Sequence, residues 1–145
     1  MQTKNYHIIV PIKDSLQTAE LTLRALQGEP VTIWNDNSTP ENTKRLHILA
    51  EELHYECIDV STLTDHPSPN YLLLLLTMRE RAILNGNHLI IVESDVIVNH
   101  DTIGKMIEQS MAEDIGMVAA VTEDDNGNIN FPYEYAHRYK RGVIK

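Results

Sequence analysis

The sequence is poor in cysteine and contains no long hydrophobic run. Its 145 residues include one cysteine, Cys57, which excludes an internal disulfide and any metal knuckle built from cysteines alone. A reducing compartment fits both absences, so we expect a cytoplasmic protein in which Cys57 is a buried, inert thiol. The longest apolar run, Leu72–Leu76, is far shorter than the roughly 18 residues of a membrane span, and no signal segment opens the chain. No transmembrane segment is therefore expected.

Basic residues are scarce as well. Lysine and arginine number 12 against 21 aspartates and glutamates, which gives a net charge of −9. A chain this acidic repels phosphate backbones and anionic lipid, so we expect no nucleic-acid partner. It can still bind a phosphorylated small molecule where a metal ion or a helix N-terminus supplies a local positive field.

The hydrophobic pattern predicts an α/β fold. Short runs rich in Val and Ile alternate with amphipathic segments of helical length. Such strand-helix-strand repeats imply a mainly parallel sheet with helices on both faces, in a single domain over residues 1–145. From about residue 123 the pattern becomes an irregular tail. The predicted strands are His7–Ile12, Val31–Asn35, Glu56–Val60, His88–Glu93 and Met117–Thr122.

Helices are predicted in the intervals between these strands and after Asp101. Asp14 or Ser15 is a candidate cap of the first helix, and Thr39 is the expected cap of the second. The Leu72–Leu76 block is compatible with a strand, but unbranched leucines followed by a long run of good helix formers favour a helix. In the tail, the acidic run that ends in Asn126-Gly127 is typical of an exposed hairpin turn.

Polar residues follow three of the predicted strands. In an open parallel sheet the ligand crevice lies beyond the C-terminal ends of the strands, so these residues are candidates for a site. They are Pro11-Ile12-Lys13-Asp14 after the first strand, Asn35-Asp36-Asn37-Ser38-Thr39 after the second and Glu93-Ser94-Asp95 after the fourth. We therefore expect acidic groups to converge at one edge of the sheet.

Glu93 and Asp95 form the most informative pair. In an extended chain, residues two apart share a face, and two carboxylates stay ionised most easily beside a cation. Oxygen ligands suit Mg²⁺ or Mn²⁺, which complete their shells with water and substrate phosphates. The alternative is a polar strand exit without a ligand. Asp36 has a similar pair of interpretations, either a turn residue or an acceptor for a nucleobase N–H or a ribose hydroxyl.

In their order along the chain, these motifs resemble those of the family 2 glycosyltransferases of the GT-A fold, a Rossmann-like nucleotide-diphospho-sugar transferase fold. The resemblance covers the chain through about Thr122. It implies that Pro11, Ile12 and Lys13 line the base pocket, with Asp36 contacting base or ribose. The segment Glu93-Ser94-Asp95 matches the family's Asp-x-Asp motif, which implies that Asp95, with Glu93, binds the Mn²⁺ or Mg²⁺ that bridges the donor diphosphate.

Two residues depart from the family pattern. Asn35 stands where the family commonly has Asp, and Glu93 replaces the first Asp of the metal motif. Inverting members of the family carry their general base in a second half of the domain. Since only 50 residues follow Asp95, we expect a fold truncated on its C-terminal side, and no catalytic residue is assigned.

The sequence therefore predicts a glycosyltransferase domain for polysaccharide biosynthesis. It would bind a nucleoside-diphosphate sugar, with UDP as the expected nucleotide, and transfer the sugar to a glycan or lipid-linked hydroxyl acceptor. One alternative is a fragment that binds the nucleotide sugar without turnover. Another is a phosphoacceptor receiver domain, in which Asp59 would be the phosphorylated residue. The seven histidines form no evident ligand set, and His47 and His54 are expected at the surface.

Overall fold

The computed structural model describes residues 5–129, which form two compact units that divide between His100 and Asp101. Expectations for the tail beyond residue 129 lie outside the described residues. The first unit contains every strand that is described. Its elements are β1 (Tyr6–Ile12), α1 (Leu16–Ala25), β2 (Val31–Asn35), α2 (Pro40–Leu53), β3 (Glu56–Asp59), a short 3-10 turn (Val60–Thr62), α3 (Tyr71–Asn85) and β4 (His88–Ile91).

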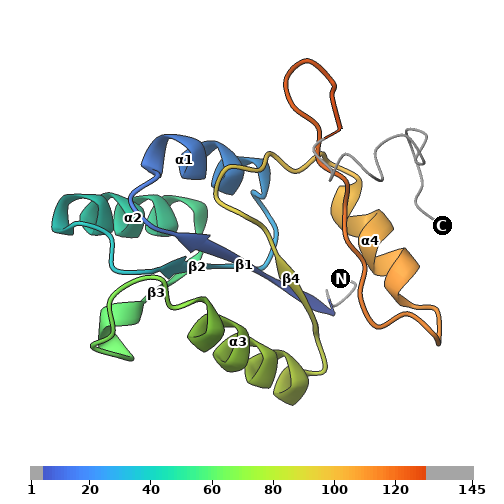
Figure 1. Ribbon diagram of the computed structural model, residues 1–145, viewed down its shortest axis with the longest axis horizontal. Coiled ribbons are helices and arrows are strands. Elements are labelled where there is room, and N and C mark those ends of the chain that lie inside the picture. The colour runs from blue at the N-terminus through green and yellow to red at the C-terminus, as the bar shows by residue number, and fades with distance from the viewer. Residues whose placement is uncertain (1–4, 130–145) are drawn as a thin grey trace. The chain divides into compact units, whose positions relative to one another are not determined.

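The four strands form a parallel sheet in the order β3-β2-β1-β4 (Figure 1). The registers place Ile12 opposite Asn35, Asn35 opposite Asp59, and Ile9 opposite Ile91. Chain order reverses between β1 and β4, which makes the space at their C-terminal ends the topological switch point of the sheet. The predicted α/β class with a parallel sheet is confirmed.

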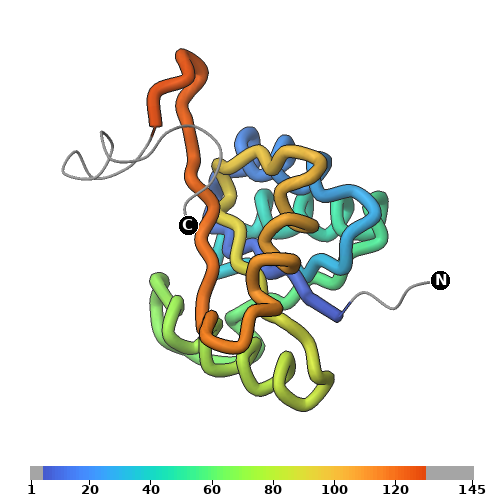
Figure 2. Tube along the Cα trace, turned by 90° about the vertical axis from the view of Figure 1, so that its right-hand side faces the viewer, coloured from blue at the N-terminus to red at the C-terminus, as the bar shows by residue number. Residues whose placement is uncertain are grey.

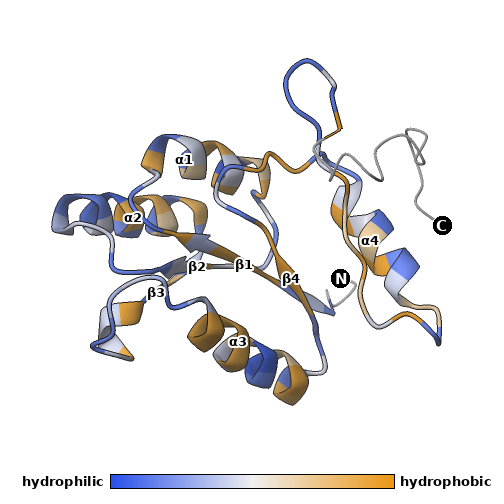
Figure 3. Cartoon of the chain, in the orientation of Figure 1, coloured by the Kyte–Doolittle hydropathy of each residue, from blue (hydrophilic) through white to orange (hydrophobic). Residues whose placement is uncertain are grey.

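Successive side chains of each strand point to opposite faces of the sheet, and hydrophobic side chains on both faces are covered by helices. Ile9 and Trp34 point to the face that packs against Leu74 and Met78 of α3. The intervening strand residues, such as Ile8 and Val10, are fully buried as well. Helices α1 and α2 cover this second face, opposite α3 (Figures 1 and 2). Hydrophobic residues predominate in β1 and β4, whereas much of α2 is hydrophilic (Figure 3).

Local signals set the helix ends. Thr39 caps α2, since its hydroxyl accepts a hydrogen bond from the Asn42 N–H, and Pro40 occupies the first turn as expected. Helix α3 ends at Gly86, whose φ of +63° is the left-handed conformation that favours glycine at this position. The Leu72–Leu76 block lies inside α3, which confirms the helical interpretation.

Several boundaries differ from the prediction. Residues Met117–Thr122 form no strand, and most of them are exposed, so a short apolar run alone was not sufficient for strand pairing. Strands β3 and β4 end one and two residues earlier than expected, at Asp59 and Ile91. Ser15 occupies the N-cap position of α1 without a side-chain cap hydrogen bond. The side chain of Asp14 binds α2 instead, as described below.

The second unit contains α4 (Thr102–Ser110) and an antiparallel bridge between Glu123 and Ile129. The bridge closes the predicted hairpin, in which Gly127 has a φ of +77° and its N–H donates to the Asp124 carbonyl. No helix within residues 5–129 is long and apolar enough to cross a membrane.

The strand order excludes the receiver-domain alternative. Receiver domains have the flavodoxin-like order, in which the third strand lies beside the first. Here β3 is an edge strand and β1 lies between β2 and β4. Asp59 is also already bound, because its carboxylate accepts from Asn35 and lies 2.8 Å from His47 Nε2.

Cys57 is partly buried on β3. Burial, followed by the nearby charges of Asp59 and Glu56, raises the pKa of its thiol to about 12. The thiol is therefore protonated at neutral pH as long as no metal is bound, and it is less buried than expected.

Candidate functional site

The C-terminal ends of β2, β1 and β4 bring the predicted site residues to one edge of the sheet. The Val92 N–H donates to the Ile9 carbonyl at 3.0 Å, and the Asp36 N–H donates to the Ile12 carbonyl at 2.9 Å. These bonds extend the ladders past the last strand residues. The segments that follow the three strands are thus neighbours at the switch point, where open α/β sheets bind ligands.

The end of β1 contributes residues of unequal accessibility. Lys13 is exposed and Pro11 is half-buried, whereas the side chain of Ile12 is 1% exposed and belongs to the core. The Lys13 ammonium donates to the Asn37 carbonyl at 3.1 Å. Of the three residues predicted to line a base pocket, Pro11 and Lys13 therefore have side chains that a ligand can reach.

Asp14 joins the loop after β1 to the loop after β2. One oxygen of its carboxylate accepts from the Thr39 N–H at 2.7 Å and from Asn42 Nδ2 at 3.0 Å, and its own N–H donates to Ser38 Oγ at 3.0 Å. The hydrogen bonds from Asn42 and Thr39 lower the pKa of Asp14. Asp14 and Asn37 both adopt a φ of +58°, a conformation in which Asp and Asn are the commonest residues after glycine. These hydrogen bonds hold the loop after β1 against the loop after β2 at the candidate site.

The Asp36 side chain is buried, and its carboxylate binds a neighbouring segment of the chain. Its carboxylate accepts from Ser68 Oγ at 2.7 Å, from the Asn70 N–H at 2.8 Å and from Asn70 Nδ2 at 2.7 Å. Burial raises the pKa of Asp36, but the hydrogen bonds from Asn70 and Ser68, with the charge of Lys13, outweigh it and lower the pKa overall. Asp36 is thus ionised at neutral pH and secures the segment that leads into α3.

The Glu93-Ser94-Asp95 segment is a turn rather than an extended strand end. The Val96 N–H donates to the Glu93 carbonyl at 3.2 Å, so the expectation that Glu93 and Asp95 share a strand face is wrong. The carbonyl of Ser94 accepts from the hydroxyl of Thr22, a fully buried residue of α1, at 3.0 Å. The core therefore anchors this turn at its middle residue.

Both carboxylates of the turn reach solvent. Tyr71 donates from its hydroxyl to Glu93 Oε1 at 3.2 Å, and among the described residues none donates a hydrogen bond to the Asp95 carboxylate. Each exposed carboxylate offers oxygen atoms, the ligands that Mg²⁺ and Mn²⁺ prefer, and such ions leave several ligand positions to water and phosphate. The pair therefore has the right chemistry for the predicted ion.

Sequence reasoning missed the residues that hold this edge together, chiefly Thr22, Ser68, Asn70 and Tyr71. Asn70 could have been predicted from the sequence, because Ser68-Pro69-Asn70 precedes a helix and has the residue types that are typical of a helix N-terminus. A threonine within an amphipathic helix gave no signal, since the Ser94 carbonyl that it binds is 72 residues away.

The fold is a Rossmann-like α/β fold with a parallel sheet. Comparison with solved structures finds the crystal structure of residues 1–349 of TarS from S. aureus, a staphylococcal glycosyltransferase, at a TM-score of 0.50 and 18% identity. The alignment covers 73% of this chain and 32% of the TarS chain, so this chain spans about a third of its length. No protein-family model and no curated protein sequence matches the chain.

Proposed function

We propose that this chain is the nucleotide-sugar-binding domain of a metal-dependent glycosyltransferase of the family 2, GT-A type. The observation that carries the proposal is the anchored turn that presents Glu93 and Asp95 at the switch point between β1 and β4. Ligands of open α/β sheets bind at this position. The similarity to TarS supports the fold on which the proposal depends.

Asp95 and Glu93 would hold Mn²⁺ or Mg²⁺ together with the donor diphosphate. When bound, the ion supplies positive charge that neutralises the departing nucleoside diphosphate. The chain's net charge of −9 favours such an ion for a phosphorylated ligand, because the ion supplies local positive charge that an acidic chain otherwise lacks. Tyr71, by donating to Glu93, would orient that carboxylate.

Pro11, Lys13 and Asp36 would form the base and ribose side of the pocket, with UDP as the expected nucleotide. Asp36 would act mainly through the segment that it holds, since both of its oxygens already accept hydrogen bonds. Ile12 would contribute backbone shape rather than side-chain contact. The sugar would be transferred to a hydroxyl of a glycan or lipid-linked acceptor.

Calorimetric titration with UDP and GDP, with and without Mn²⁺, tests this proposal. We expect binding of one nucleotide to require Mn²⁺, and Asp95→Ala to weaken it at least about tenfold, because a lost metal ligand removes charge stabilisation worth more than 1.4 kcal/mol. Asp114→Ala removes another exposed carboxylate and should leave the affinity unchanged. Metal-independent binding, or equal affinity in the Asp95→Ala variant, would contradict the assignment.

A binding domain without turnover is the second candidate, because the chain spans about a third of TarS and no described residue is assigned as general base. Hydrolysis of the nucleotide sugar separates the two candidates. Release of UDP from a bound UDP-sugar that depends on Asp95 supports an enzyme, whereas tight binding without release supports the binding module.

A further inference from the structure

A second group of ligating side chains lies at the end of β3. Cys57 and Asp59 are two residues apart on this strand and point to the same face, which is the face that α2 covers. His47 projects from α2 toward them, and its Nε2 lies 2.8 Å from Asp59 Oδ2. One ligand atom from each of His47, Cys57 and Asp59 lies within 4.8 Å of the others. Within residues 5–129, no other trio of such residues is grouped so closely.

The three donor atoms form a zinc-type set. An imidazole nitrogen, a cysteine sulfur and a carboxylate oxygen are the usual protein ligands of Zn²⁺, and sites with three protein ligands keep a fourth position for water or another ligand. Around one tetrahedral Zn²⁺ such atoms lie roughly 3.3 to 3.8 Å apart. The present spacings, from 2.8 Å between His47 and Asp59 to at most 4.8 Å, bracket these distances.

Neighbouring groups already fix the carboxylate. Asn35 Nδ2 donates to Asp59 Oδ1 at 2.7 Å, which leaves Oδ2 directed at His47. Asn35 is 2% exposed, its Nδ2 also donates to Thr43 Oγ1 at 3.0 Å, and its Oδ1 accepts from the Ser38 N–H. Hydrogen bonds of this kind orient the carboxylate ligands of metal sites. Asn35, which stands where the resembled family commonly has Asp, thus orients the Asp59 carboxylate of this second group.

We propose that His47, Cys57 and Asp59 bind a Zn²⁺-type transition-metal ion, with water in the fourth position. On binding, the Cys57 S–H bond breaks, the proton passes to solvent and a sulfur–metal bond forms. His47 Nε2 gives up to solvent the proton of its hydrogen bond to Asp59 Oδ2, a solvent proton binds His47 Nδ1, and the freed Nε2 and Oδ2 atoms form bonds to the ion. The thiolate selects Zn²⁺ over Mg²⁺ or Mn²⁺, so the site is chemically distinct from the Glu93 and Asp95 pair and independent of the proposed function.

Titration with Co²⁺ tests the site, because the chain has a single cysteine. Thiolate-to-cobalt charge-transfer absorption therefore reports Cys57 alone. We expect the wild-type protein to develop this absorption together with the visible bands of tetrahedral Co²⁺, and Zn²⁺ to abolish both. Cys57→Ser should lose the charge-transfer band, and His47→Gln should bind Co²⁺ at least about tenfold more weakly.

Matched measurements separate ligation from unfolding and from the nucleotide site. His100→Gln removes another exposed histidine and should titrate like wild type. Circular dichroism should show that Cys57→Ser and His47→Gln remain folded. In both variants Mn²⁺-dependent nucleotide binding should persist at wild-type affinity. Absence of the charge-transfer band in the wild-type protein, or Co²⁺ titrations of the two variants that match the wild type, would overturn the proposal.

Discussion

The two ends of the parallel sheet use polar residues in opposite ways. At the N-terminal end, polar side chains from β1, β2, β3 and α3 bind one another in a closed network. At the C-terminal end, Asp14 and Asp36 are bound to neighbouring loops, while Glu93 and Asp95 remain exposed. The first arrangement stabilises the fold, and the second leaves charge available to a ligand.

The closed network consists of His7, Thr32, Glu56 and Arg81. The buried Thr32 hydroxyl donates its single proton to Glu56 Oε2 at 2.7 Å, so it must accept from His7 Nε2, which lies 2.7 Å away. This bond fixes the histidine tautomer with its proton on Nε2. Arg81 Nη1 completes the network at 2.7 Å from Glu56 Oε2.

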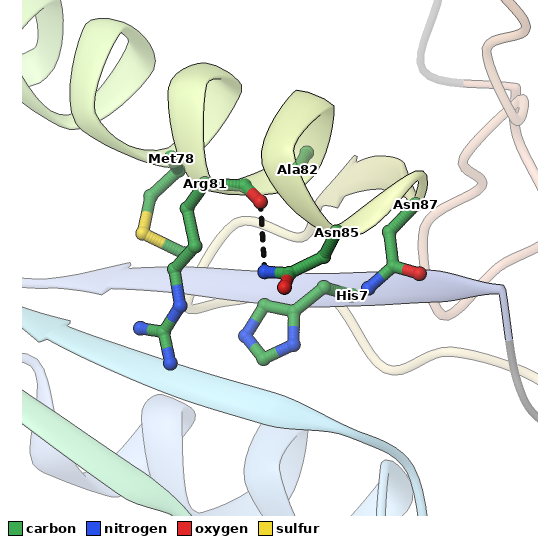
Figure 4. A pocket seen from close by; sticks show the side chains of 6 residues that line it. All are labelled: His7, Met78, Arg81, Ala82, Asn85 and Asn87. Atoms are coloured by element: carbon green, nitrogen blue, oxygen red, sulfur yellow. Dashed lines mark hydrogen bonds between the residues drawn. The ribbon is translucent and has the colours of Figure 1, made fainter.

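A hollow of about 90 Å³ adjoins this network, lined by His7 and Arg81 together with other residues of α3 and with Asn87, which precedes β4 (Figure 4). Asn85 Nδ2 donates to the Arg81 carbonyl at 2.8 Å across one turn of α3. The hollow is small for an organic ligand, whose pockets typically measure about 300 to 1,000 Å³. A larger hollow of about 350 Å³, lined in part by Asp14 and Asn42, lies at the opposite, C-terminal end of the sheet.

The largest expected effect is a difference in stability between variants of two aspartates at the C-terminal edge, the buried Asp36 and the exposed Asp95. Asp36→Ala leaves the Asn70 and Ser68 donors without their buried acceptor, so we expect the free energy of unfolding to fall by about 2 to 4 kcal/mol. Asp95→Ala, which removes an exposed carboxylate, should change it by less than about 0.5 kcal/mol. Urea denaturation of both variants checks this. Equal destabilisation would mean that the two carboxylates do not differ in structural role.

Removal of the Thr32 hydroxyl, which lies at the centre of the N-terminal network, should destabilise the protein. Thr32→Val keeps the shape of the side chain but leaves the half-buried His7 donor without its acceptor, whereas the exposed Glu56 keeps its ion pair with Arg81, so we expect a loss of about 1 to 2 kcal/mol in unfolding free energy. Thr77→Val on α3 is the matched control, because its hydroxyl has no hydrogen bond within residues 5–129. Denaturation curves for the two variants would refute a closed network if they shifted equally.

The sequence predicted the fold well where local pattern and burial agree. The run Val31–Asn35 is buried throughout and begins with three β-branched residues, and its strand was predicted with the bounds that the structure shows. Met117–Thr122 has similar residues, but a strand also needs a partner, and partners cannot be read from a single segment. Leu72–Leu76 shows the reverse case, in which helix propensity along the whole segment decided correctly.

The site was predictable in position and less so in detail. Strand ends identified Lys13, Asp36 and the Glu93-Ser94-Asp95 segment, because parallel strands bring their C-terminal ends to one edge. Their partners were not predictable, since Asp36 binds residues 32 and 34 positions away. Likewise, His47 was expected as a surface histidine. It is exposed, but its contact with Asp59 depends on how α2 packs on β3.

The smallest expected effect concerns pH and sharpens the description of the N-terminal network. Burial and then the charge of Arg81 lower the pKa of His7 below its ordinary value of 6.5, against the opposing charge of Glu56. Between these two pKa values the unfolded chain binds more protons than the folded one, so stability falls as the pH decreases through this window and levels off below the folded pKa. The slope is at most about 1.4 kcal/mol per pH unit.

His7→Gln isolates this effect, because glutamine can donate the same hydrogen bond to Thr32 and does not titrate. Unfolding free energies measured at about pH 7.5 and about pH 5.5 should differ less in the variant than in the wild type. The carboxylates Asp36 and Glu56, whose pKa values are lowered, lose their contribution only at more acidic pH, below their ordinary values of 3.8 and 4.5. An unchanged pH dependence in His7→Gln would show that the imidazole stays solvated, and the network would then end at Thr32.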